Sequence, residues 1–362
     1  MDLEIIFAES AYSDKELYRQ KQLPETVKKL DEFLQKNAPD FYSARKALDF
    51  EKGFLYLCRD MQIKLDDKPF VYFFDFNYPF YTEISNLTPD YSLILRSGIR
   101  HMKYDMEGGG NRFFRNGNSV IDSLLLLIDR IVERLDAERP EGYEKKSLWF
   151  RNIKDKPAST FCEALQRLLF LNQMLWQTGS RLVGLGRLDM LLYPYYVQEQ
   201  ERRTLSKEQA ADILKDFINC LHEHYWFKSS ALLGDTGQVI VIGGSERDGG
   251  YLRNELTDIF LELERELQLP DPKIVLRVNR NIPQDLLNSG LRCMMTGTGS
   301  PLLSNDDIII PALMDFGVED TDAYDYATSA CWEPLIGGRS SSMNNVARLS
   351  YMKALDNLLL EE

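Results

Sequence analysis

The feature that most constrains the fold is a pair of short runs of β-branched residues separated by helical segments. QVIVIG at Gln238–Gly243 and IVLRV at Ile274–Val278 are apolar at consecutive positions, which is typical of strands buried on both faces. Helical patterns cover Asn254–Leu269 between the two runs and Pro283–Met295 after the second. This alternation predicts a parallel sheet or barrel, with functional loops at the carboxyl ends of its strands.

Long helices are predicted before these strands. SVIDSLLLLIDRIVERL at Ser119–Leu135 has apolar residues at helical spacing and charges on the other side. Thr160–Glu163 and Ser206–Gln209 fit the capping-box pattern, in which a hydroxyl and a Glu or Gln satisfy the free N–H groups at a helix start. The helices that they begin run to about Trp176 and Trp226. The expected fold class is therefore α/β with a large helical share.

The first part of the chain differs from the rest. Ser13–Lys36 is highly charged and predicts a helix interrupted at Pro24, whereas FVYFFDF at Phe70–Phe76 predicts a short aromatic strand. We expect an N-terminal helical and strand segment over residues 1–85 and a second unit over residues 86–362.

Charge and composition exclude several classes of protein. The 362 residues include 56 acidic and 43 basic side chains, a net charge of −13, which argues against nucleic acid and anionic membranes as partners. The longest stretch without a charge, Leu168–Ser180, is too short to cross a bilayer, and Met1–Ala8 shows no secretory signal. The five cysteines form no CxxC pair, so they are expected to be reduced thiols. These features predict a cytoplasmic, soluble protein.

Two other patterns do not support a binding site. His222 and His224 lie two residues apart, a spacing that points helical side chains to different faces and does not favour a metal pair. GGSERDGG at Gly243–Gly250 lacks the Lys-Ser/Thr ending of a phosphate loop and the spacing of a dinucleotide loop. It is better interpreted as a tight turn in which glycines supply positive φ angles.

The segment SACWEPLIGG at Ser329–Gly338 contains the residues best suited to chemistry. It places one thiol, Cys331, in a loop with the carboxylate of Glu333 two residues later. Pro334 and the two following glycines would fix the backbone of this loop. On spacing alone, a buried cysteine beside an exposed glutamate is the somewhat better interpretation, because isolated cysteines are usually small hydrophobic residues.

The order of several segments resembles the glycyl radical enzymes, in the lineage of pyruvate formate-lyase and of the glycerol and choline-type eliminases. The resemblance runs from about Asn86 to Leu358. The matching segments are NLTPDYSLILRSGI (Asn86–Ile99), GLGRLDMLLYPYY (Gly184–Tyr196), GQVIVIGGSERDGGYLRNELTDIFLELE (Gly237–Glu264), LPDPKIVLRVN (Leu269–Asn279), GTGSPLLSNDDIIIPAL (Gly297–Leu313) and DAYDYATSACWEP (Asp322–Pro334).

The resemblance implies a fold and a chemistry. The fold would be half of a ten-stranded (β/α) barrel, ending just after the cysteine loop. Cys331 would be the thiyl radical that abstracts hydrogen from the substrate, and Glu333 the base that removes a proton, a step that contributes about 10²–10⁴-fold in rate. The loop would lie inside the barrel, where excluded water protects a radical.

Three positions separate subclasses of the family. Ala330 stands where the acyl-transferring branch has a second cysteine, so the resemblance favours a lyase or dehydratase that cleaves a C–O, C–N or C–C bond. Trp332 replaces the small residue usual between Cys and Glu and would reshape the pocket wall or pack away from it. Arg181 lies where relatives place a polar substrate-binding group. It would bind an anionic substrate bidentately or form a structural salt bridge.

The family carries its radical on a glycine in a C-terminal RVxGY-like segment, and the sequence does not contain that segment. We therefore expect a fragment, a split enzyme completed by a second polypeptide, or a degenerate relative. No bound cofactor is expected, since the radical would come from the missing segment or a partner chain. The resemblance further implies a small polar substrate, a radical-SAM activating enzyme and a homodimer. A non-catalytic scaffold subunit and a formate acyltransferase-like enzyme remain alternatives.

Overall fold

The computed structural model describes residues 23–47, 49–63, 65, 68–71, 86–107, 112–177, 182–223, 237–329 and 332–340. Most of these residues are helical. The helices are α2 (Leu23–Asn37), α3 (Pro39–Lys46), α4 (Phe50–Asp60), α5 (Tyr91–Arg96), α6 (Ile99–Glu107), α7 (Arg112–Glu138), α8 (Tyr143–Ile153), α9 (Phe161–Gln177), α10 (Leu188–Glu201), α11 (Lys207–Glu223), α12 (Glu255–Leu267), α13 (Gln284–Met294), α14 (Asp306–Asp315) and α15 (Asp320–Tyr324).

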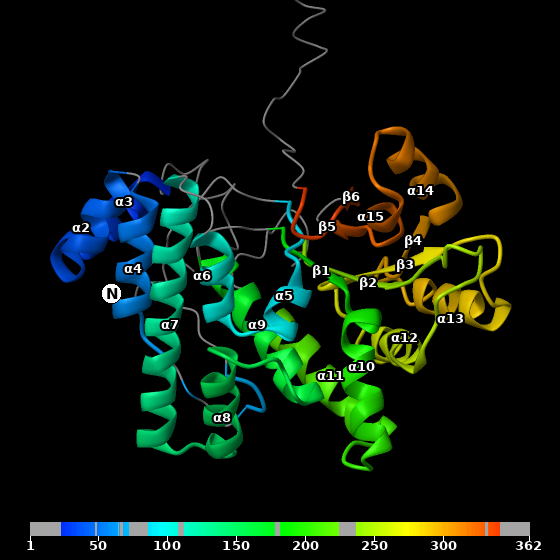
Figure 1. The fold of residues 1–362 in the computed structure, drawn as a ribbon, viewed down its shortest axis with the longest axis horizontal. Coiled ribbons are helices and arrows are strands. Elements are labelled where there is room, and N and C mark those ends of the chain that lie inside the picture. The colour runs from blue at the N-terminus through cyan, green and yellow to red at the C-terminus, as the bar shows by residue number, and fades with distance from the viewer. Residues whose placement is uncertain are drawn as a thin grey trace, which may run out of the picture.

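Two small sheets complete the described fold. The larger sheet is parallel and has the order β1-β2-β3-β4, and the smaller is an antiparallel hairpin of β5 and β6. The strands are β1 (Gly184–Arg187), β2 (Val239–Gly243), β3 (Lys273–Val278), β4 (Leu302–Asn305), β5 (Ala327–Ser329) and β6 (Glu333–Leu335). Figure 1 shows α2, α3, α4 and α7 on one side of the molecule and the parallel sheet with α12 and α13 on the other.

The parallel sheet is covered on both faces, as expected for central strands whose residues are apolar apart from Lys273 and Arg277. Ile240, Ile242, Ile274 and Leu276 belong to the large core that includes the helices. Their neighbours along the same strands, among them Val275, pack instead against Ala327 of β5. Since side chains alternate across a strand, the helices cover one face and the β5–β6 hairpin covers the other, which is called the inner face below.

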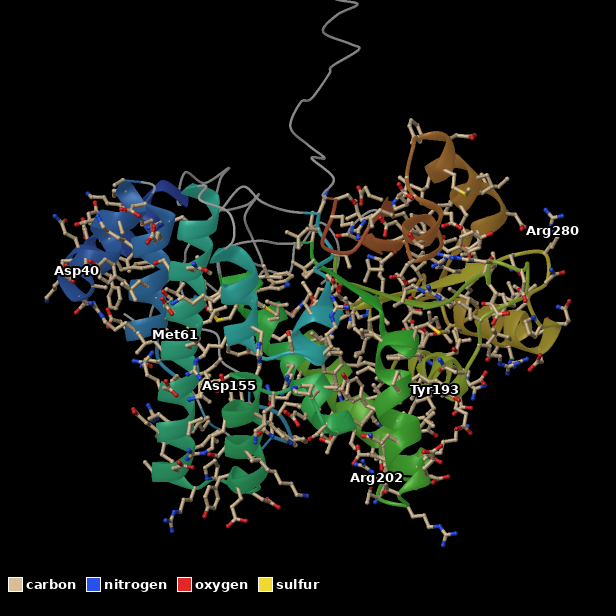
Figure 2. All side chains as sticks on the ribbon, viewed as in Figure 1. Asp40, Met61, Asp155, Tyr193, Arg202 and Arg280 are labelled. Carbon is tan, nitrogen blue, oxygen red and sulfur yellow. The ribbon has the colours of Figure 1, made fainter. Side chains whose placement is uncertain are left out.

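The helical region has its own buried charge pair. Arg167 and Glu163, one turn apart on α9, are each 1% exposed and their side chains are 2.5 Å apart. Arg167 also donates to the carbonyl oxygens of Ile94 and Lys156, so it joins α9 to two neighbouring segments. By contrast, Asp40 and Arg280 lie at opposite outer edges of the molecule in Figure 2, and both side chains are exposed.

The α/β fold class and the main predicted elements are confirmed. The two predicted strands are β2 and β3, and the helices predicted around them are α12 and α13. The helix predicted over Ser119–Leu135 lies within the longer α7. Ser206 and Gln209 form the predicted capping box, because each side chain bonds the backbone N–H of the other.

One prediction of detail was wrong, and another stays a prediction. The described part of α2 begins at Leu23 with Pro24 in its first turn, but the residues before Leu23 lie outside the described part of the chain, so the interruption at Pro24 is not tested. At the start of α9, Thr160 accepts from the N–H of Glu163, but the Glu163 carboxylate turns to the N–H and hydroxyl of Ser159 instead of closing the box.

Several predicted features lie outside the described residues. These include the first part of the helix predicted over Ser13–Lys36 and most of the strand predicted over Phe70–Phe76. The division at residue 85 stays a prediction. Within the described part of the chain, no helix is both long and apolar enough to cross a membrane.

Candidate active site

The candidate site is built around the β5–β6 hairpin. Ser329 at the end of β5 is paired with Glu333 at the start of β6, and three residues connect them. The N–H of Trp332 donates to the carbonyl of Ser329 at 3.1 Å, which closes the turn. The Ser329 hydroxyl donates to the carbonyl of Leu182 at 2.6 Å, so the hairpin is attached at this point to the segment that precedes β1.

The predicted catalytic residues fall on this hairpin, though only part of the set lies within the described residues. Glu333 is partly buried and lies directly across the hairpin from Ser329, two residues from the Ala327–Leu335 pair. Because alternate residues share a face, Glu333 is on the side of the hairpin that Ala327 packs against the sheet. Trp332 has a positive φ of 77° and is 48% exposed. Cys331 and Arg181 lie outside the described residues.

Gly184 allows the hairpin to approach the parallel sheet closely. A Cβ atom at this position would lie 2.2 Å from Oγ1 of Thr88 and 2.6 Å from the carbonyl oxygen of Thr328. Any side chain larger than hydrogen would therefore displace one of these groups. The chain just after β6 is attached to the segment that contains Thr88, because the N–H of Gly338 donates to the carbonyl of Thr88 at 2.8 Å.

A cavity of about 350 Å³ lies beside the hairpin. Its walls come from the hairpin, from β1 and α10, and from the segment around α5. The lining residues are Thr88, Pro89, Asp90, Tyr91, Ser92, Leu185, Gly186, Arg187, Met190, Leu191, Asp322, Asp325, Ala327, Ile336, Gly337 and Arg339. A larger cavity of about 640 Å³ lies at the ends of β3 and β4, but no residue of the hairpin lines it.

Three buried oxygen atoms near β1 have no hydrogen-bond partner among the residues that the structure describes. They are Oδ1 of Asn86, Oγ1 of Thr88 and Oγ1 of Thr328. The parallel bridge between Leu87 and Val183 turns Asn86 and Thr88 to the same side of their segment. Buried polar atoms are normally hydrogen-bonded, so these oxygens are groups that a polar ligand could satisfy.

A buried charged network lies at the carboxyl ends of β3 and β4. Arg277 and Asp306 are both 0% exposed and form a bidentate pair, with Nε and one terminal nitrogen each 2.9 Å from a carboxylate oxygen. The hydroxyl of Tyr326 donates to the same carboxylate at 2.7 Å, and the N–H of Ser245 donates to its other oxygen at 2.8 Å. Every oxygen of Asp306 is thus satisfied, which buried charges require.

Two further charged residues, Arg187 and Asp189, lie at the end of β1 and the start of α10. Burial lowers the pKa of Arg187, and the nearby Arg277 lowers it further. Burial raises the pKa of Asp189, although its carboxylate accepts from the N–H of Gly243 and the hydroxyl of Thr257, both at 2.7 Å. Asp189 therefore joins the end of β2 to the first turn of α12.

Sequence reasoning missed Arg277, Asp306 and Arg187. The available signal was the single charge within the apolar run IVLRV, because a charge in a buried strand requires a partner. The segment Gly243–Gly250, interpreted as a tight turn, is one: Ser245 is bridged to Tyr251, and Gly243, Gly244 and Gly249 have positive φ. His222 bonds the carbonyl of Asp271 through its ring, while His224 lies outside the described residues.

The family model for pyruvate formate lyase-like proteins matches residues 61–361. The chain belongs to this family. The match includes β1 to β6 and the whole cysteine loop, so it covers the candidate site as well as the sheet.

Curated relatives and solved structures agree with this assignment. The probable dehydratase YbiW of Escherichia coli is 31% identical over 52% of this chain and 24% of its own length. The (2S)-3-sulfopropanediol dehydratase of Klebsiella oxytoca is 24% identical over 60% of this chain and 27% of its own length. A glycyl radical enzyme from Archaeoglobus fulgidus superposes with a TM-score of 0.72 at 19% identity, over 88% of this chain and 56% of that one.

These coverages show how much of each related protein the chain matches. The chain spans about a quarter of the length of these curated relatives and about half of the solved structure. It shares the fold of the glycyl radical enzymes over that part.

Proposed function

We propose that this chain carries the catalytic thiol of a glycyl radical lyase or dehydratase that acts on a small polar metabolite. The observation that carries the proposal is the β5–β6 hairpin, which lies on the inner face of the parallel sheet with Glu333 on its sheet-facing side. The three-residue connection of that hairpin includes Cys331. Family membership supports the assignment of radical chemistry to this thiol.

In the proposed reaction, a thiyl radical on Cys331 takes a hydrogen atom from a substrate carbon and becomes a thiol. Glu333 removes the proton of a hydroxyl on that carbon, which helps the neighbouring leaving group to depart with its electron pair. The product radical then takes the hydrogen atom back from the thiol. The thiyl radical is restored, and Glu333 gives the proton to the departing group, which leaves as its conjugate acid and returns Glu333 to the carboxylate.

Substrate binding would use the polar atoms around the hairpin. The unpartnered oxygens of Asn86, Thr88 and Thr328 are buried hydrogen-bonding groups, suited to hydroxyl groups of a substrate. Arg181 would supply a bidentate contact for a carboxylate, sulfonate or phosphate. We propose Trp332 as part of the pocket wall.

The radical itself would come from a glycine in a segment or partner chain that this sequence does not contain, installed by a radical-SAM activating enzyme. A homodimeric assembly is part of the same proposal. No bound cofactor is required of the chain in this scheme.

The test is to express the chain anaerobically together with its neighbouring genes. The product is then assayed with the hydroxylated compounds that appear in the names of its relatives. These compounds are (2S)-3-sulfopropanediol, isethionate, 1,2-propanediol and glycerol. We expect a carbon-centred radical signal by electron paramagnetic resonance and elimination of one of these compounds. Acetyl-coenzyme A and formate as products would instead support the acyltransferase alternative.

Cysteine variants make the test specific. Cys331→Ala should abolish turnover while leaving the radical signal, because the radical forms before the thiol acts. Cys162→Ala is the matched control, since Cys162 is partly buried at the start of α9, and its loss should not change turnover. Full activity of Cys331→Ala would refute the mechanism, and inactivity of every form with a stable radical would favour the scaffold alternative.

A further inference from the structure

Two arginines from different strands reach the backbone that leads into the cysteine loop. Arg277 lies on β3 next to Val278 and shares the inner face with Val275, since side chains alternate along the strand. Arg187 is the last residue of β1. A Cβ atom on Gly244 would lie 3.1 Å from the guanidinium carbon of Arg277 and 3.2 Å from a terminal nitrogen of Arg187. The two guanidinium groups therefore both lie beside Gly244.

Both guanidinium groups donate to main-chain carbonyls just before β5. Arg277 donates to the carbonyl oxygens of Tyr324 at 3.0 Å and Tyr326 at 3.1 Å. Arg187 donates to the carbonyl of Tyr324 at 3.3 Å and to the carboxylate of Asp325 at 3.0 Å. The segment 324–326, which directly precedes β5, is thus held at consecutive residues by two fixed positive groups.

The contacts of Arg277 depend on the planar fork of its side chain. The guanidinium binds the Asp306 carboxylate with one edge, the two carbonyls with another nitrogen, and stacks on the ring of Tyr326 with its centre 3.9 Å away. A lysine ammonium would keep the charge, but it is a point donor and cannot span a carboxylate and two carbonyls at once. The identity of the side chain matters here as well as its charge.

We propose that Arg277 and Arg187 are positioning residues that fix the backbone of the cysteine loop, and thereby the site of hydrogen abstraction. The proposal rests on the function proposed above for Cys331. Neither arginine is assigned a contact with substrate. They act through the carbonyls of Tyr324 and Tyr326, with Asp306 holding Arg277 in place.

The test measures the rate at which each cysteine reacts with iodoacetamide, resolved by mass spectrometry of peptides. Arg277→Lys should speed alkylation of Cys331 about tenfold, the effect of losing one charge-assisted hydrogen bond on a local opening equilibrium. Cys58, Cys220 and Cys293 are buried away from the loop, so their rates should not change. This measurement needs no radical and no substrate. Its failure can therefore be distinguished from a failure of the proposed reaction.

Arg167→Lys is the matched control, because Arg167 is equally buried, is paired with a carboxylate and donates to two carbonyls, but lies on α9. Its Cys331 rate should equal that of the wild type. Equal Cys331 rates in Arg277→Lys and wild type, or a common increase at all four cysteines, would overturn the proposal.

Arg187→Lys is the second variant, and it decides the question if Arg277→Lys does not fold. It should speed alkylation of Cys331 by a smaller factor, since a lysine can keep one of the contacts to Tyr324 and Asp325. An unchanged Cys331 rate in this variant would count against the proposal. In an active complex, both variants should lower kcat more than they raise KM.

Discussion

Among the described residues, the helical region and the sheet region each contain one arginine–carboxylate pair in which both side chains are buried, and the two pairs differ in sequence separation. Arg167 and Glu163 are one turn apart on a single helix, so their meeting follows from helical geometry. Arg277 and Asp306 are separated by 29 residues and come from β3 and the start of α14. The first pair lies in a contact between α9 and neighbouring segments, whereas the second pair connects β3 to α14 beside the candidate site.

This difference shows that the site depends on contacts between elements that lie far apart in the sequence, whereas the pair on α9 is local. A local pair can form as soon as its helix forms. A pair between distant elements requires the sheet to be complete, because both partners are desolvated only then. The predictions below test whether the sheet region is the more sensitive of the two, beginning with the largest expected effect.

Removal of the carboxylate of Asp306 should be the most damaging change. Asp306→Ala leaves Arg277 buried without its partner, which costs about 3–5 kcal/mol of unfolding free energy. Urea denaturation followed by circular dichroism measures this loss. Asp155→Ala is the control, because Asp155 is 47% exposed and paired with Arg100 at the surface of the helical region (Figure 2), and it should cost less than about 1 kcal/mol.

The second prediction concerns pH and contrasts two buried glutamates. Glu163 faces Arg167, whereas Glu264 on α12 is 5% exposed and its described hydrogen bond comes from the hydroxyl of Thr298. Burial raises the pKa of Glu264 from 4.5 to about 7. The folded protein therefore holds this proton over a range in which the unfolded chain releases it, and stability must fall as pH rises from 4.5 to 7.

The expected loss across that window is on the order of 3 kcal/mol, measured as urea unfolding free energies at several pH values. Glu264→Gln should remove this contribution and be more stable than the wild type above pH 7. A wild-type profile that rises through the window and is unchanged in Glu264→Gln would show that the carboxylate is ionised in the fold.

The third prediction tests the contact between β1 and the hairpin. Gly184→Ala should destabilise the protein by roughly 1–3 kcal/mol, because the added methyl group meets Thr88 and the backbone of Thr328. Gly337→Ala is a suitable control within the same site, since its nearest neighbour would be the Pro89 carbonyl at 3.7 Å. The stability of both variants is measured by thermal unfolding. Equal stabilities would contradict the close contact between β1 and the hairpin at Gly184.

The smallest expected effect is in the helical region. Ser206→Ala removes the hydroxyl that accepts from the N–H of Gln209, and loss of such a cap costs about 1 kcal/mol. Thr160→Ala at the start of α9 removes the corresponding bond to Glu163. Similar losses in both variants, measured by urea denaturation, would show that the cap hydroxyl matters more than completion of the box.

The sequence predicts the elements whose periodicity is strong and misses those that depend on distant contacts. The strands β2 and β3 are evident because β-branched and other apolar residues follow one another, as VIVI in β2 and IVL in β3. The short strand β1 is not, because GLGR contains two glycines and becomes a strand only when β2 pairs with it. For the same reason β4, with the sequence LLSN, is visible only beside β3.

The candidate site shows the same division. Glu333 and Cys331 are predicted because they share one short motif with a chemical meaning. Arg277 stands out as a single charge within an apolar run, but nothing local identifies Asp306 as its partner, because 29 residues separate the two. Residues that touch the reaction can be found from a motif, whereas residues that hold the motif in place require the fold.

The position of Asp189 has a consequence for how this chain can be divided. Its buried carboxylate takes hydrogen bonds from Gly243 on β2 and Thr257 on α12. A truncated protein that kept Asp189 but stopped before these donors would leave one oxygen of this carboxylate without its donors, with only the N–H of Met190 bonding the other. The shortest autonomous version of the sheet must therefore reach past Thr257, and a library of nested deletions should lose soluble product at that boundary.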